Sequence, residues 1–115
     1  MDLKAWIDGY VRAWNSNDPD DIASLFTDDA RYHTEPFSAP WEGREEIVAN
    51  WLARADQPGE ANFEWRTVAV DGDVGVVQGT TRYPDQTFSN LWVIRFSPDG
   101  RCREFTEWWM EQPAE

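Results

Sequence analysis

The sequence predicts an α+β domain in which helices precede a mainly antiparallel sheet. In the first half of the chain, apolar residues recur at spacings of three and four, as in amphipathic helices. From residue 62 onward the pattern changes to alternation, as in strands with one buried face. Short turns separate the alternating segments, which is typical of an antiparallel meander.

Three helices are predicted before residue 62. The opening 16 residues form the first, which Asp2 caps and the polar run 15–17 ends. Asp18 caps a short second helix and Pro19 occupies its first position. A short strand is predicted at residues 30–34. The third helix begins near residue 43 or 44 and stops at the breakers of "DQPGE".

Four longer strands follow the third helix. They are predicted at residues 62–70, 73–83, 88–97 and 102–111. The sequences "DGD" and "SPDG" predict tight hairpin turns, and "YPDQ" predicts the remaining corner. Consecutive strands are therefore expected to lie side by side.

Composition limits the function classes. The 115 residues suit one domain, residues 1–115, with a single core. The net charge of −12 disfavours binding to nucleic acid or to anionic membranes. Cys102 is the only cysteine, and no apolar run is long enough to span a membrane. Because the N-terminus also lacks a signal-peptide pattern, we expect a cytoplasmic protein.

The late strands carry apolar residues on both faces. Alternation places Phe105, Glu107 and Trp109 on one face of the last strand. The other face is predicted to carry Cys102, Glu104, Thr106, Trp108 and Met110. Helices can cover one face of the sheet, and a second copy of the chain can cover the other. We therefore expect a homodimer formed through the sheet.

The order of these segments resembles the SnoaL-like branch of the NTF2-like superfamily. The resemblance rests on "LFTDDARY", "WEGREEI", "VAVDGDVGVVQG" and "SPDGRCREFTEWW", and it covers roughly residues 3–111. It implies a cone-shaped barrel in which a strongly curved sheet encloses a pocket, and a dimer through the outer face of the sheet. Members of the superfamily include ketosteroid isomerases, polyketide cyclases, epoxide hydrolases, dehydratases and non-catalytic binding proteins, so the fold does not define the function.

The resemblance implies that His33 and Glu35 lie at the pocket wall. In ketosteroid isomerases the general base is an Asp before a Pro, and here Glu35 precedes Pro36. A carboxyl group in an apolar pocket has a raised pKa and can transfer protons near neutral pH. The alternative is that Glu35 is a solvated loop carboxylate and His33 a hydrogen-bonded wall residue.

Glu107 is the third candidate acid or base. The run "REFTEWW" resembles a closing strand that carries an acidic pocket residue in many relatives. A carboxylate between Phe105 and Trp109 is costly unless it is paired or protonated. The alternative is that this face is the outer one. Arg82 lacks a second Asp two residues away, which makes an epoxide hydrolase less favoured.

Aromatic and amide side chains complete the predicted pocket. Tyr10 is a possible hydrogen-bond donor on the first helix. The expected ligand-binding residues are Tyr10, Trp14, Trp41, Asn90, Trp92 and Trp109. A single His and a single Cys argue against a zinc site, and no phosphate-binding glycine motif is present, so no metal and no cofactor are expected.

Two hypotheses follow. The first is a cofactor-independent isomerase, cyclase, dehydratase or hydrolase that uses a pocket carboxylate on a small hydrophobic ring compound. The second is a small-molecule binding protein without catalysis. An enzyme requires at least two of His33, Glu35 and Glu107 to converge, whereas a binding protein requires only the concave pocket.

Overall fold

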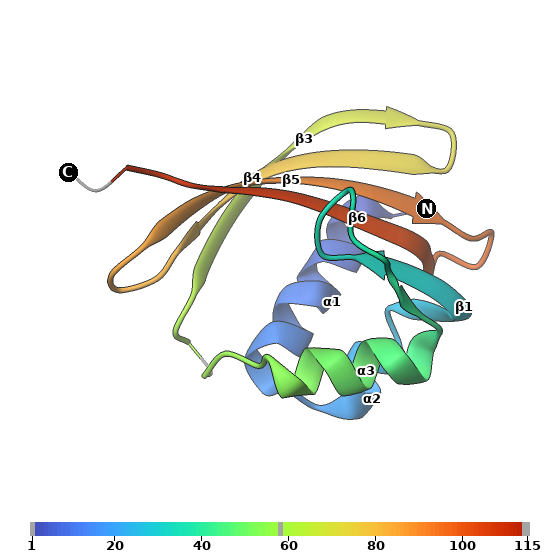
Figure 1. Cartoon of the computed structure of the whole chain (residues 1–115). Coiled ribbons are helices and arrows are strands. Elements are labelled where there is room, and N and C mark those ends of the chain that lie inside the picture. The colour runs from blue at the N-terminus through green and yellow to red at the C-terminus, as the bar shows by residue number, and fades with distance from the viewer. Residues whose placement is uncertain (1, 58, 114–115) are drawn as a thin grey trace.

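Three helices lie on the concave side of one curved six-stranded sheet (Figure 1). The computed structural model describes residues 2–57 and 59–113. The elements follow in this order: α1 (Leu3–Ser16), α2 (Pro19–Ala23), β1 (Phe26–His33), β2 (Trp41–Glu42), α3 (Arg44–Ala53), β3 (Asn62–Asp71), β4 (Val74–Arg82), β5 (Thr87–Phe96) and β6 (Cys102–Glu111). The predicted α+β class is confirmed.

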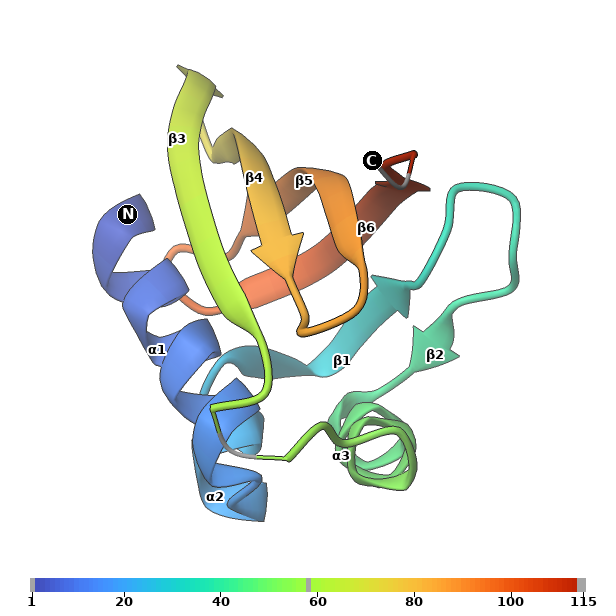
Figure 2. The same cartoon turned by 90° about the vertical axis from the view of Figure 1, so that its left-hand side faces the viewer.

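The sheet has the strand order β2-β1-β6-β5-β4-β3. Only the pair of β1 and β6 is parallel, and the other neighbours are antiparallel. Figure 2 shows that the sheet curves around α1 but does not close, so β2 and β3 remain its edges.

The residues predicted to begin and end the helices do so in the structure. The Asp2 carboxylate accepts a hydrogen bond from the Ala5 amide at 3.0 Å, and Asn17 ends α1 with a φ of 53°. Asp18 caps α2 and Pro19 is its first residue. Gly43 precedes α3 with a φ of 86°, a conformation that favours glycine.

The four long strands match their predicted ranges within about one residue at each end. Asp71 pairs with Val74 across the first hairpin, where Gly72 has a φ of 59°. The short strand was predicted too short. It covers residues 26–33 rather than 30–34 because Phe26 already pairs with Cys102, and the register shifts before Arg31 pairs with Glu104. Polar residues 27–29 form that irregular stretch.

Aromatic side chains of α1 form the centre of the core. Trp6 and Tyr10 are buried against Phe105, with ring centroids 6.1 and 5.6 Å away. The ring centroid of Trp92 lies 4.7 Å from that of Tyr10 and 5.2 Å from that of Phe105. Burying a ring of this size typically contributes about 2–3 kcal/mol, so this contact anchors α1 in the sheet.

A bulge in β6 corrects the predicted assignment of its faces. Arg95 pairs with Glu104 while Phe96 pairs with Cys102, so one residue of β6 has no partner. Cys102 is therefore buried with Phe105 instead of sharing the outer face with Trp108. Burial raises the pKa of the Cys102 thiol to about 12, which keeps it protonated and unreactive.

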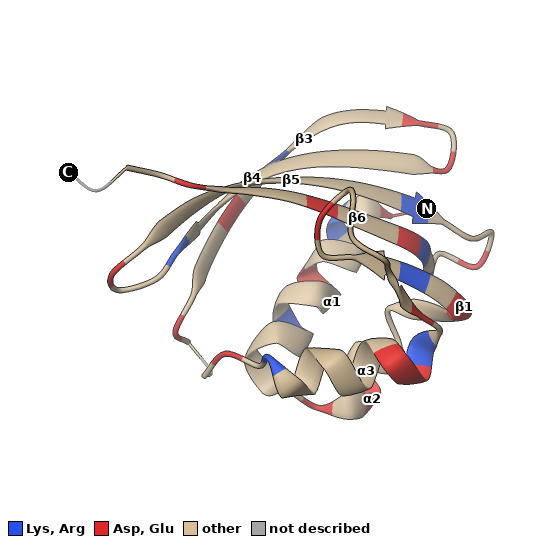
Figure 3. Cartoon of the chain, in the orientation of Figure 1, with Lys and Arg blue, Asp and Glu red and all other residues tan. Residues whose placement is uncertain are grey.

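Charged residues lie mainly at the surface. Figure 3 shows acidic residues in the turns between the long strands and at the start of α3. Within residues 2–57 and 59–113, no helix combines the length and apolarity needed to cross a bilayer.

Candidate functional site

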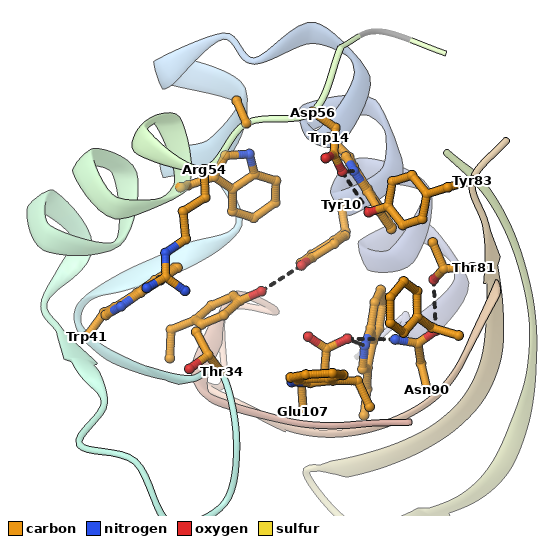
Figure 4. A pocket seen from close by; sticks show the side chains of 16 residues that line it. Tyr10, Trp14, Thr34, Trp41, Arg54, Asp56, Thr81, Tyr83, Asn90 and Glu107 are labelled. Atoms are coloured by element: carbon orange, nitrogen blue, oxygen red, sulfur yellow. Dashed lines mark hydrogen bonds between the residues drawn. The ribbon is translucent and has the colours of Figure 1, made fainter. Parts of the chain in front are cut away.

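A cavity of about 400 Å³ lies between the helices and the concave side of the sheet (Figure 4). It is lined mainly by aromatic residues, with a few polar groups among them. The lining residues are Tyr10, Trp14, Tyr32, Thr34, Trp41, Trp51, Arg54, Ala55, Asp56, Thr81, Tyr83, Phe88, Asn90, Trp92, Glu107 and Trp109. A cavity of this size and composition suits a small organic ligand.

Glu107 is held in place by two neutral donors. It pairs with Trp92 across β5 and β6, and the indole Nε1 donates to its Oε2 at 2.8 Å. The Asn90 amide donates to the same oxygen at 2.9 Å. The Thr81 hydroxyl donates to the side-chain oxygen Oδ1 of Asn90 at 2.7 Å, which sets the orientation of the Asn90 side-chain amide. The carboxyl group is therefore positioned before any ligand binds.

The Glu107 carboxyl group combines burial with an open acceptor. Burial raises its pKa above the ordinary range, and the bonds from Trp92 and Asn90 oppose this effect only in part. Its second oxygen, Oε1, has no hydrogen-bond partner in the part of the chain that the structure describes. Figure 4 shows the carboxyl group facing the cavity. Such a group can exchange a proton with a bound molecule.

Two tyrosines lie across the cavity from this carboxyl group. The hydroxyls of Tyr10 on α1 and Tyr32 on β1 are 2.7 Å apart. Burial raises the pKa of both hydroxyls, and the negative charge of Glu107 adds to the effect. Both therefore stay protonated, and the pair can donate a hydrogen bond into the cavity.

Asp56 organises the mouth of the cavity. Its Oδ2 accepts hydrogen bonds from the Trp14 indole and the Tyr83 hydroxyl, each at 2.8 Å. These contacts join the segment after α3 to α1 and to the end of β4. The side chain of Arg54 points away from Asp56 toward Trp41, with its guanidinium carbon 5.5 Å from the centre of the Trp41 ring (Figure 4).

His33 and Glu35 do not line the cavity. Because Tyr32 points inward, strand alternation directs His33 to the opposite face, where its Nε2 lies 2.9 Å from Glu104. Glu35 is exposed in the turn after β1. Arg82 pairs with Glu64 at 3.0 Å, also outside the lining. The structure therefore does not bring the three candidate acid–base residues together.

The structure does bring the remaining predicted residues together. Around Glu107 it places Tyr10, Trp14, Trp41, Asn90, Trp92 and Trp109. The sequence analysis missed Tyr32, Asp56 and Tyr83. The alternation of Ala30, Tyr32 and Thr34 along one strand could have indicated that Tyr32 faces the cavity. Asp56 lies in a loop, where no periodicity indicates which way a side chain points. For metal binding, no group of three or more His, Cys, Asp or Glu side chains gathers within residues 2–57 and 59–113.

Comparison with protein families shows to which family the chain belongs. The sequence profile of the SnoaL-like domain matches residues 7–105. The chain belongs to the SnoaL-like family. No curated protein matches the sequence of this SnoaL-like domain.

Solved structures share the fold of this SnoaL-like domain. An NTF-2 like protein from Burkholderia xenovorans superposes with a TM-score of 0.76 at 16% identity, covering 97% of this chain and 85% of that one. The epoxide hydrolase/cyclase-like enzyme SalBIII, which acts in pyran ring formation in salinomycin, gives 0.73 at 20% identity, covering 93% and 89%. An LEH-like epoxide hydrolase from M. tuberculosis gives 0.63 at 17% identity, covering 92% and 80%. At these identities the similarity shows the fold alone.

Proposed function

We propose that this SnoaL-like protein is a cofactor-independent acid–base enzyme acting on a small hydrophobic ring compound bound in the cavity. One observation carries the proposal. Glu107 is fixed by Trp92 and Asn90 through one oxygen, while the other oxygen remains open to an aromatic cavity. A structural carboxylate would be expected to use both oxygens within the protein.

The surrounding groups support a proton-transfer reaction. The Glu107 carboxylate takes a proton from a carbon or hydroxyl of the ligand, and its raised pKa makes it a stronger base for this step than an exposed carboxylate. The hydroxyl pair of Tyr10 and Tyr32 donates to the oxygen on which negative charge develops. Isomerisation, cyclisation and dehydration can each begin with this proton transfer. In hydrolysis the carboxylate would instead take the proton from an attacking water molecule and return it to the leaving group. His33 and Glu35 have no role in this mechanism, because neither lines the cavity.

A non-catalytic binding protein is the alternative. The nine aromatic side chains among the described lining residues favour it equally, because a binding protein needs only the apolar wall. SalBIII, which has a role in pyran ring formation, shares the fold, so the fold is compatible with an enzyme. Turnover of a bound ligand separates the two functions.

A ligand screen followed by a turnover assay tests the proposal. Purified protein is screened by thermal shift against steroids, aromatic polyketides, terpenoids and their epoxides. A ligand at 100 times its Kd adds about 2.7 kcal/mol, which raises Tm by roughly 10 °C for a domain of this size. Each hit is then incubated with the wild type, with Glu107→Gln and with Glu104→Gln.

The two variants make the assay specific to the cavity. Glu107→Gln keeps the size and an acceptor oxygen but cannot take up a proton, so we expect turnover to fall by about a hundredfold or more. Glu104→Gln makes the same change on the same strand outside the cavity and should retain turnover. Binding without turnover in the wild type would favour the binding protein. The absence of any hit would contradict both functions.

We also propose that two copies pair through the outer face of the sheet. Trp108 and Met110 of β6 are exposed there, and Val68 of β3 is also exposed. Leu91 extends this apolar strip because it pairs with Trp108 across β5 and β6. An exposed strip of this kind is typical of an interface between subunits. A cytoplasmic location remains a prediction from the sequence.

A further inference from the structure

The cavity has an unusual charge composition for a site that takes neutral rings. Nine of the sixteen described lining residues are aromatic, and two others, Asp56 and Glu107, are acidic. Arg54 is the only Lys or Arg in this lining, and it is exposed at the mouth. Binding a neutral ring needs only the aromatic wall, and acid–base chemistry on it would use Glu107 but would leave Asp56 without a role.

Neither carboxylate has a cation of the chain as its partner. Throughout residues 2–57 and 59–113, no Lys, Arg or His forms an ion pair with Asp56 or Glu107. Their hydrogen-bond donors are neutral, namely the side chains of Trp14, Tyr83, Asn90 and Trp92. A buried negative charge without a countercharge is costly, and a bound cation removes that cost.

The cavity wall already accommodates one cation. The Arg54 guanidinium lies over the Trp41 ring, with its carbon 5.5 Å from the ring centre. Aromatic rings attract cations through the negative potential of their faces, and the attraction is stronger where water is excluded. Trp92 is buried beside the Glu107 carboxyl group, and the half-exposed Trp109 lines the cavity two residues along the same strand as Glu107, so aromatic rings and negative charge coincide there.

We infer that the cavity selects organic cations, in which a quaternary or protonated amine is attached to a hydrophobic ring. The positive group would lie between the aromatic wall and Glu107, and the ring would fill the remaining apolar space. The net charge of −12 raises the local concentration of such ligands near the protein. This inference rests on the proposed use of the cavity as the ligand site.

Two probes of equal shape test the charge preference. Phenyltrimethylammonium and tert-butylbenzene differ only in the positive nitrogen that replaces a carbon atom. Each is titrated into the full chain at pH 8, well above the ordinary carboxyl range, and binding is followed by tryptophan fluorescence. The neutral probe gains more from leaving water, so simple apolar burial favours it. We expect the cation to bind at least tenfold more tightly.

Matched variants assign the preference to the cavity. Glu107→Gln should reduce the preference for the cation about tenfold or more. Glu104→Gln removes the same charge from the outer face of β6 and should leave the preference unchanged, which controls for net charge. If Glu107→Gln does not fold, Asp56→Asn supplies the second test and should also reduce the preference.

The outcomes separate this inference from the proposed function. Equal binding of the two probes, or tighter binding of the neutral one, overturns the cation preference while leaving the apolar pocket intact. Binding of neither probe overturns the cation preference, and the function then depends on the wider ligand screen. A cation preference that survives equally in all variants would also overturn the inference, because it would arise from net charge.

Discussion

Glu107 experiences two opposing effects. Burial in an aromatic cavity favours its neutral form, whereas the indole of Trp92 and the amide of Asn90 favour its charged form. Burial is the larger effect, so the pKa is raised. The sequence suggested this group because an acidic residue lies between two aromatic neighbours on an alternating strand. The two donors that hold it were predicted only as ligand-binding residues.

The stability of Glu107→Gln relative to the wild type should depend on pH. Because folding raises the pKa of Glu107, the folded state favours the protonated carboxyl. This contribution is complete below the ordinary carboxyl pKa and is lost as the pH rises through the raised value. Glutamine stays neutral, so we expect equal Tm values near pH 4 and a higher Tm for the variant at pH 8. Thermal unfolding across this range measures the difference.

Glu104→Gln is the control for this experiment. Glu104 accepts from His33 and approaches Arg95 at 3.8 Å, so removing its charge should not stabilise the protein at high pH. If Glu107→Gln were clearly less stable than the wild type at pH 8, the Glu107 charge would be stabilising. That result would contradict a carboxyl group poised for proton transfer.

Strand β4 approaches β3 closely at one point beneath the cavity. A Cβ at Gly79 would lie 2.5 Å from two atoms of the Phe63 ring, which itself stacks on Trp92 at 4.7 Å. A Cβ at Gly75, on the same strand, would lie 3.0 Å from the flexible end of Leu3. The rigid Phe63 ring therefore leaves no room for a side chain at position 79, whereas the flexible Leu3 side chain can make room at position 75.

Gly79→Ala should destabilise the protein more than Gly75→Ala. The Phe63 ring must move and disturb its stacking on Trp92, which we expect to cost about 1–3 kcal/mol. Leu3 can rotate away, so Gly75→Ala should cost less. Urea unfolding of both variants gives the comparison, and equal losses would mean that Phe63 adjusts as easily as Leu3.

The outer face of the sheet should control the state of association. Two copies that each carry a net charge of −12 repel one another, so the apolar strip around Trp108 must overcome this repulsion. Added salt screens the repulsion and should strengthen the dimer. The dimerisation constant should therefore depend on both the apolar strip and the net charge of the protein.

Trp108→Lys should convert the proposed dimer to a monomer. It places a charge in the centre of the apolar strip, where desolvation is costly. Phe37→Lys is the control, because Phe37 is also an exposed aromatic residue but lies in the loop between β1 and β2, away from the outer face of the sheet. Sedimentation equilibrium at low and moderate salt measures both variants. A monomeric wild type in all conditions would contradict the dimer.

Local patterns in the sequence were sufficient for the helices, their caps, the hairpins and the limits of β3 to β6. These features depend on residues close together in the chain, and the periods of helices and strands are visible there. Together with the resemblance to the SnoaL-like family, they selected Glu107, Tyr10 and Trp92 as candidates, because each lies on a strand or helix with clear periodicity.

Contacts between distant segments decided the rest. The inward face of β1 follows from its parallel pairing with β6, about 70 residues later, and this places Tyr32 rather than His33 at the cavity. The bulge that buries Cys102 arises from the register of β5 against β6. Asp56 reaches Trp14 and Tyr83 only because α3 ends beside α1 and β4. Register and packing are properties of pairs of segments, so they emerge only when the chain folds.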